Sequence, residues 1–225
     1  KISDIKMPLT IPAVDVQDSR EYIFTNSIPK NSKDKTKYIT EIPVGKAIRA
    51  SSSFPAIFCP CTFEKHTFLD GGILNNFPSL EVKKQDVDKI LTVNFKADDI
   101  DENSNVMDII MRSLDIMGNK LSEESLQTSD MVLTIQTDKT GLLEVEKLDD
   151  CYKYGYRQTM NNIDKIKELI GLRRTLNCYW AVTVIVHCSW NFNKKIDIYL
   201  LLVKCNSKSM FEYNIEKREE GCYEY

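Results

Sequence analysis

The chain has 225 residues, of which 42% are apolar and 28% are charged, an ordinary composition for a globular protein. This length fits one domain, or one domain with a small appendage. The net charge of −3 excludes a protein that binds nucleic acid through a strongly basic surface. The sequence has no run of 18 apolar residues that would predict a transmembrane segment. It begins with Lys1, and residues 1–10 lead directly into a predicted strand, so we expect a segment to be missing before them.

The first part of the chain predicts short strands around a single helix. Segments rich in β-branched and aromatic residues predict strands over residues 8–16, 21–25 and 67–69. Pro43 precedes a predicted helix over residues 44–51, because proline is favoured at a helix start. The inner face of this helix would carry Ala47, Ile48 and Ala50. The third strand runs directly into the tripeptide Asp70-Gly71-Gly72.

The second part alternates strands with longer helices. We predict strands over residues 89–95 and 131–135, and helices over residues 105–122 and 148–170. Such alternation is typical of an α/β fold with a mostly parallel sheet. We therefore expect one domain over residues 1–171. Residues 172–225 form an unassigned C-terminal extension, in which residues 178–205 are patterned like a β-hairpin.

The cysteines favour a reduced, cytoplasmic protein without a disulfide framework. Their number is seven, which is odd, and their spacing is irregular. Cys59-Pro60-Cys61 with His66 offers only part of a zinc site, since such sites usually combine about four ligands in two separated pairs. Two small apolar residues beside a strand are the simpler interpretation, and we expect neither a metal nor a cofactor.

Asp70-Gly71-Gly72 is the most informative segment for chemistry. An acidic residue at the end of a buried strand lies at the edge where α/β folds place their sites. Two following glycines permit a sharp turn and a close approach of backbone to a ligand. An Asp-Gly pair is also a common turn former, so the tripeptide alone does not establish catalysis.

Its surroundings resemble the patatin-like phospholipase family. A helix ends in Ala50-Ser51-Ser52-Ser53-Phe54-Pro55, a spacer follows, and a strand then leads into Asp70-Gly71-Gly72 and Asn76-Phe77-Pro78. The flanking segments also look like family elements: the strand at residues 11–16, the strand at 129–135 and the helix that begins at Leu148. The resemblance covers about residues 9–171 and predicts the later part of the family domain.

This resemblance implies a three-layer α/β/α hydrolase fold and a lipid acyl hydrolase. The family uses a Ser–Asp dyad, in which the serine lies in a Gly-x-Ser-x-Gly turn and the aspartate in Asp-Gly-Gly. Asp70 matches the dyad base, with Gly71 and Gly72 in its motif. No Gly-x-Ser-x-Gly occurs in this chain, so the nucleophile and the glycine-rich oxyanion turn are expected outside it. The implied substrate is a phospholipid or another acyl-ester lipid, reached by transient contact with a membrane surface.

Other candidate residues have simpler interpretations. Ser51, Ser52 and Ser53 follow a helix and have no flanking glycine, unlike a nucleophile elbow, so capping and packing roles are favoured. His66 precedes Asp70 by four strand residues, a rise of roughly 13 Å. It is therefore expected at the surface or at a strand edge rather than in a triad, and His187 is interpreted in the same way.

Two further charged residues are expected to have structural roles. Asp15 ends a predicted strand and is expected to accept hydrogen bonds in a turn rather than to act as a catalytic acid. Arg49 is expected on a helix surface, with pairing to a lipid phosphate as the less favoured role.

Two functions of different class follow. The first is a lipid acyl hydrolase with Asp70 as its base. The second is a non-catalytic, truncated or degenerate patatin-like scaffold, which the missing elbow favours. A dinucleotide-binding protein is disfavoured because the chain has no Gly-x-Gly-x-x-Gly.

Overall fold

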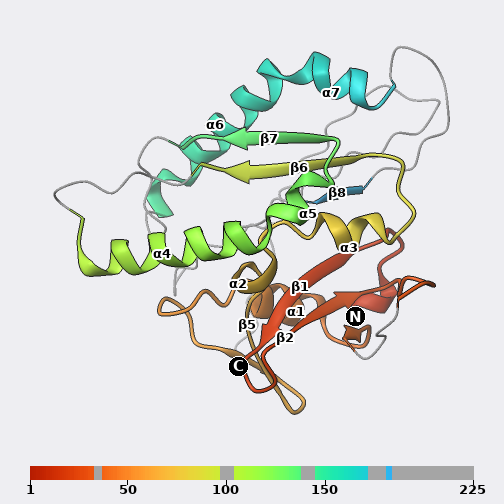
Figure 1. Ribbon diagram of the computed structural model, residues 1–225, viewed down its shortest axis with the longest axis vertical. Coiled ribbons are helices and arrows are strands. Elements are labelled where there is room, and N and C mark those ends of the chain that lie inside the picture. The colour runs from red at the N-terminus through yellow and green to blue at the C-terminus, as the bar shows by residue number, and fades with distance from the viewer. Residues whose placement is uncertain (33–36, 97–103, 138–144, 172–180, 184–225) are drawn as a thin grey trace.

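The computed structural model describes residues 1–32, 37–96, 104–137, 145–171 and 181–183, and within these ranges helices flank two β-sheets (Figure 1). His187 and most of the predicted C-terminal hairpin lie outside the described residues. The mixture of helices and strands confirms the α/β class.

The first sheet has five strands in the order β3-β2-β1-β5-β4. They are β1 (Thr10–Asp15), β2 (Arg20–Thr25), β3 (Tyr38–Ile39), β4 (Cys61–Phe63) and β5 (His66–Asp70). Only β2 and β3 pair in parallel, and the other three pairs are antiparallel. The expectation of a mostly parallel sheet is therefore wrong here. Two connections are too short for a parallel crossover, and Glu64 takes a positive φ of 51° in the turn between β4 and β5.

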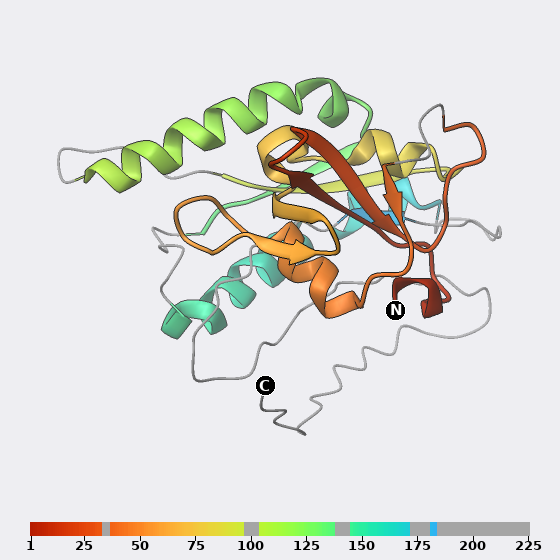
Figure 2. The ribbon, with the colours of Figure 1, turned by 90° about the horizontal axis from the view of Figure 1, so that it is seen from below.

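The second sheet has three parallel strands in the order β7-β6-β8. They are β6 (Ile90–Phe95), β7 (Met131–Ile135) and β8 (Ala181–Thr183). Strand β8 belongs to the extension that the sequence left unassigned, and it pairs in parallel with β6. Figures 1 and 2 both place β6 and β7 between helix α4 on one side and helix α6 on the other.

The α-helices are α1 (Val44–Ser51), α2 (Gly72–Asn75), α3 (Ser79–Lys83), α4 (Val106–Leu121), α5 (Glu123–Gln127), α6 (Leu148–Asn161) and α7 (Ile163–Leu169). Single 3₁₀ turns span Ile2–Asp4 and Val145–Lys147. The predicted bounds of α1 and β7 are confirmed, but the predicted helix over 148–170 is two helices. The break falls at Asn162, whose side-chain amide donates to the Gln158 carbonyl at 2.9 Å and so competes with regular helical bonding.

The main core lies between the first sheet and α1. Ala47 and Ala50 on the inner face of the helix are fully buried against the sheet. Phe24 and Phe68 are also fully buried, and their rings meet edge to face with centroids 5.0 Å apart, a favoured aromatic geometry. Phe68 lies two residues before Asp70, so the packing of β5 fixes the strand that carries the candidate base.

Candidate functional site

Asp70 is the last residue of β5 and pairs with Ala13 in β1. Its carboxylate Oδ1 accepts a hydrogen bond from the Gly72 backbone N–H at 2.7 Å, and its own N–H donates to the Ser53 carbonyl at 3.1 Å. The side chain is half-buried. The residue is therefore held from both neighbouring segments, at the point where strand β5 turns into helix α2.

Gly71 allows this turn to lie directly on strand β1. A Cβ atom at position 71 would be 2.6 Å from the Pro12 carbonyl oxygen, closer than real Cβ atoms come to backbone. The Gly71 N–H also donates to the Ser51 carbonyl at 3.3 Å. Glycine is needed here for close approach, because the residue is buried against backbone that cannot move aside.

Helix α2, which follows the turn, is held in place by α4 and by Ser122, the residue directly after α4. The Asn76 backbone N–H donates to Ser122 Oγ at 2.6 Å, and the Asn76 side-chain amide donates to Asn119 Oδ1 at 2.8 Å. A Cβ atom at Gly118 would lie 2.7 Å from the Gly72 carbonyl oxygen, so the two backbones are in close contact. The position of the Asp-Gly-Gly turn thus depends on α4.

Two of the three serines at the end of α1 contact the Asp-Gly-Gly turn through their backbone: the Ser53 carbonyl accepts from the Asp70 N–H and the Ser51 carbonyl from the Gly71 N–H. Ser52 Oγ donates to the Ile48 carbonyl at 2.9 Å, and Ser53 Oγ donates to the Arg49 carbonyl at 2.7 Å, so both hydroxyls bond back to their own helix. Ser53 is fully buried. These contacts agree with the expected capping and packing roles.

Asp15 and His66 form a buried pair that the sequence did not predict. Asp15 is 2% exposed, accepts a hydrogen bond from the Gln17 N–H at 2.9 Å, and bonds His66 Nδ1 through its other oxygen. Burial favours a higher pKa for Asp15, but the hydrogen bonds from Gln17, His66 and Thr67 outweigh it and lower the pKa.

The position of His66 corrects one expectation and agrees with another. Its side chain is only 12% exposed and β5 is an inner strand, so the predicted surface or edge position is wrong. The reason is β4, which covers this side of β5 and which the sequence did not reveal. The imidazole bonds Asp15 instead of Asp70, and the predicted turn role of Asp15 is confirmed by its bond to Gln17.

Arg49, in the last turn of α1, is half-buried and bonds residues that follow the helix. Its guanidinium donates to Ser53 Oγ at 2.5 Å and to the Cys59 carbonyl at 2.8 Å. Cys59 is exposed and Cys61 is buried, and both are free thiols. In the described part of the chain no group of three or more His, Cys, Asp or Glu residues lies close enough to hold a metal ion.

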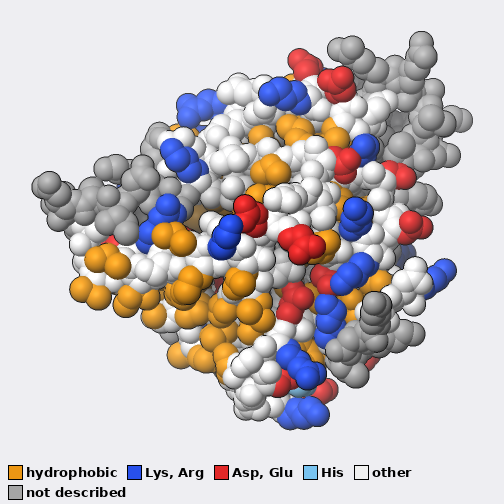
Figure 3. Space-filling view, viewed as in Figure 1, with side chains coloured by type: hydrophobic (Ala, Val, Ile, Leu, Met, Phe, Trp, Pro, Cys, Tyr) orange, Lys and Arg blue, Asp and Glu red, His pale blue; other side chains and the backbone are white. Residues whose placement is uncertain are grey.

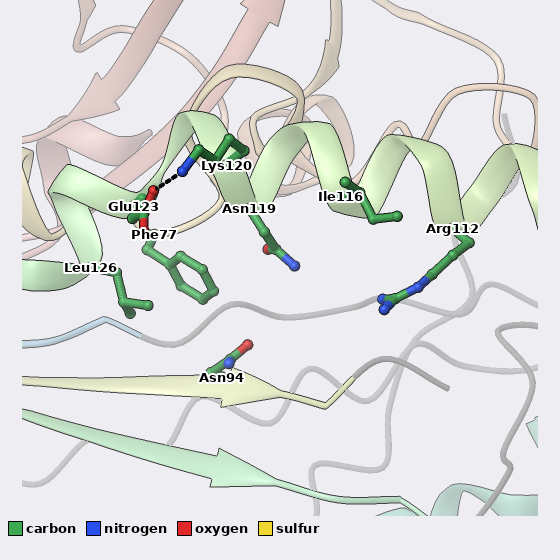
Figure 4. Close-up of a pocket in the computed structure, with 8 residues that line it drawn as sticks. All are labelled: Phe77, Asn94, Arg112, Ile116, Asn119, Lys120, Glu123 and Leu126. Carbon is green, nitrogen blue, oxygen red and sulfur yellow. Dashed lines mark hydrogen bonds and ion pairs between the residues drawn. The ribbon is translucent and has the colours of Figure 1, made fainter. Parts of the chain in front are cut away.

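A cavity of about 450 Å³ lies between helices α4 and α5 and strand β6 (Figure 4). The side chains of Arg112, Ile116 and Asn119 point from α4 toward β6, and Asn94 faces them from that strand. Phe77, Leu126, Lys120 and Glu123 complete the lining. Asp70 is not among the lining residues, so the cavity is separate from the candidate base.

The fold and the turn together define an α/β protein with an acidic residue at a strand end, followed by two glycines, of which Gly72 donates to its carboxylate. Residues 8–83 match the family model of patatin-like phospholipase, and this segment contains β1 to β5, the three serines and Asp70-Gly71-Gly72. The match confirms the resemblance drawn from the sequence: residues 8–83 are similar to patatin-like phospholipases, a family of lipid acyl hydrolases. None of the helices within the described ranges is long and apolar enough to cross a membrane.

Proposed function

We propose that this chain is part of a patatin-like lipid acyl hydrolase in which Asp70 is the general base of a Ser–Asp dyad. The observation that carries the proposal is the half-buried Asp70 carboxylate at the end of β5, held by the Gly72 N–H inside the matched segment. A serine hydroxyl is a weak nucleophile and needs an adjacent base. A carboxylate can serve as that base when its surroundings are partly shielded from water.

The nucleophile belongs to a Gly-x-Ser-x-Gly turn outside these 225 residues, because no such sequence occurs among them. The hydroxyls of Ser52 and Ser53 are engaged with helix carbonyls, which argues against either as a substitute. Oxyanion-hole amides are likewise to be supplied by the segment that carries the elbow. The substrate class is an acyl-ester lipid, no cofactor takes part, and the location is cytoplasmic.

The test is hydrolysis of a soluble short-chain acyl ester by the protein expressed with its natural upstream coding sequence. We expect Asp70→Asn to lower kcat by about 100- to 10,000-fold, the usual contribution of a general base. The matched control is Asp88→Asn, which changes an exposed aspartate in the loop before β6. Full activity of Asp70→Asn would overturn the assignment of the base.

The second candidate is a non-catalytic patatin-like scaffold, which the absence of a Gly-x-Ser-x-Gly turn favours. It is tested by exposing the 225-residue chain to a fluorophosphonate, which labels reactive serines. Both candidates predict no labelling of this chain alone, so labelling that disappears in Ser51→Ala would contradict both. Ester hydrolysis by the longer protein then separates them, since only the first candidate predicts it.

A further inference from the structure

Helix α4 turns polar side chains toward the second sheet. Figure 3 shows hydrophobic side chains gathered along this helix on the outside of the molecule, whereas Arg112 and Asn119 point toward β6, with Ile116 between them (Figure 4). Asn94 faces them from that strand. A helix that covers a sheet normally places its apolar residues on the side that faces the sheet. Such departures from the folding pattern are expected where a protein binds something.

The polar groups of this cavity are available to a ligand. Among the residues that the structure describes, none is paired with the Arg112 guanidinium or with the Asn94 side-chain amide. Asn119 Oδ1 accepts a hydrogen bond from the Asn76 side chain at 2.8 Å, which leaves the Asn119 amide nitrogen to donate elsewhere. A guanidinium has five N–H donors and each amide has two. The cavity therefore offers hydrogen-bond donors from both of its walls.

The charged side chains that line the cavity leave one positive charge unbalanced. Lys120 and Glu123 pair with each other at 2.5 Å, so their charges cancel. In the described structure neither Asp108 nor Asp115, one turn away on either side, forms an ion pair with Arg112. The cavity thus complements a ligand with a single negative charge. A carboxylate fits this requirement, because its two coplanar oxygens match the fork of a guanidinium.

The far end of the cavity is apolar. In Figure 4 Phe77 and Leu126 lie at one end and Arg112 at the other, so the ligand would carry an apolar group at some distance from its carboxylate. The volume of about 450 Å³ lies within the range of about 300–1,000 Å³ that small-molecule sites occupy. The size and the two-ended lining together select a small amphiphilic molecule.

We propose that this cavity binds a small carboxylate that carries an apolar group. The carboxylate pairs with Arg112 and accepts hydrogen bonds from the amides of Asn94 and Asn119, while the apolar group packs at the other end of the cavity. Binding is reversible and no covalent bond changes. The candidate base does not line this cavity, so the proposal does not depend on the hydrolase activity.

The test is a chemical-shift titration of the isotope-labelled 225-residue chain with hexanoate. We expect saturable shifts of the side-chain amide signals of Asn94 and Asn119, with a dissociation constant of about 1 mM or lower for a ligand of this size. Acetate lacks the apolar group and hexanol lacks the carboxylate, so each should bind at least about ten-fold more weakly. Equal binding by either compound, or no saturable shift with hexanoate, would overturn the proposal.

Two variants test the polar end of the cavity. Asn94→Asp replaces an amide by a carboxylate of the same shape, which repels the ligand and competes with it for Arg112. Arg112→Gln removes the charge that the ligand needs. Each should lower the affinity for hexanoate at least about ten-fold, and a backbone amide spectrum like that of the unchanged chain shows that the variant is folded.

The matched control is Arg157→Gln, which removes an exposed arginine of α6 that does not line the cavity. It should bind hexanoate like the unchanged chain. Unchanged affinity in either cavity variant, or an equal loss in the control, would contradict the assigned site.

The cavity and the candidate base can fail separately. Asp70→Asn should bind hexanoate like the unchanged chain, because Asp70 is not a lining residue. Loss of hexanoate binding in this variant would show that the cavity is not a separate site. Full ester hydrolysis by Asp70→Asn with intact hexanoate binding would contradict the assignment of the base alone.

Discussion

The regions built on the two sheets bury their apolar side chains to very different extents. In the five-stranded sheet, Ala13, Phe24 and Phe68 are fully buried against α1 and one another. Around the three-stranded sheet, Phe95 of β6 and the α4 side chains of Ile110 and Met117 remain exposed to solvent. The first region is a closed core that fixes the position of Asp70. The second region leaves some large apolar side chains exposed, and substitutions in both regions test this contrast.

The largest expected effect comes from Phe68→Ala. This side chain is fully buried and its ring packs against Phe24, so its removal should lower the free energy of unfolding by about 3–5 kcal/mol. Phe95→Ala in β6 is the matched control, because Phe95 is 39% exposed, and it should cost about 1 kcal/mol or less. Urea denaturation followed by circular dichroism measures both. Equal losses would contradict the contrast between the two regions.

A smaller effect is expected from Gly71→Ala. The added methyl would meet the Pro12 carbonyl, and the forced shift of the turn should cost about 1–3 kcal/mol. In the second region, Gly155 of α6 has no atom within 4 Å of its would-be Cβ. Gly155→Ala should therefore stabilise the protein, by up to about 1 kcal/mol, through helix propensity. Relative to the unchanged protein, the melting temperature should fall for Gly71→Ala and rise for Gly155→Ala. A change in the same direction for both variants would contradict this account.

The smallest effect concerns Glu81 of α3, which joins the two regions. It is 4% exposed and bonds Lys37 at 2.6 Å and Lys84 at 2.5 Å. Burial favours a higher pKa, but these two cations outweigh it and hold the pKa of Glu81 below its ordinary 4.5. Its contribution to stability is complete above about pH 4.5 and is lost as the pH falls through the lower, folded-state pKa.

Glu81→Gln should therefore lower the free energy of unfolding at pH 7. It should also make the decrease in this free energy between pH 5 and pH 3 smaller than in the unchanged protein. The lowered pKa of Asp15 works in the same direction and remains in this variant, so the slope should shrink without vanishing. The measurement is urea denaturation at a series of pH values. An unchanged slope would show that the Glu81 ion pairs do not govern acid stability.

The sequence predicted elements whose signal is local. Pro43 before an apolar-patterned segment defined α1, and the β-branched residues of 131–135 defined β7. Asp70 at a strand end was also visible, because the Gly-Gly that follows is a local turn signal. The short strands β3 and β4 carry too few residues for a periodic pattern, and the sequence did not reveal them.

What the sequence could not predict depends on pairing between distant segments. Asp15 and His66 are 51 positions apart, and they meet because β1 pairs antiparallel with β5. If β1 and β5 were parallel, as the sequence led us to expect, Asp15 and His66 would lie at opposite ends of the strand pair. The contact of Gly118 with the Asp-Gly-Gly turn is likewise invisible in the sequence. Gly72 is explained there as part of a turn and Gly118 as part of a helix, and neither assignment indicates that the two residues meet.

The contact between Gly118 and Gly72 restricts how this protein can vary in sequence. The obstacle to a side chain at position 118 is the carbonyl oxygen of residue 72, an atom that every amino acid carries. No replacement at position 72 can make room for it, so the two positions cannot compensate for each other. Only a movement of the whole helix would accommodate a larger residue, and that movement would break the bonds from Asn76 to Asn119 and Ser122. We therefore expect natural variants to keep glycine at position 118 even while the neighbouring residues on α4 change.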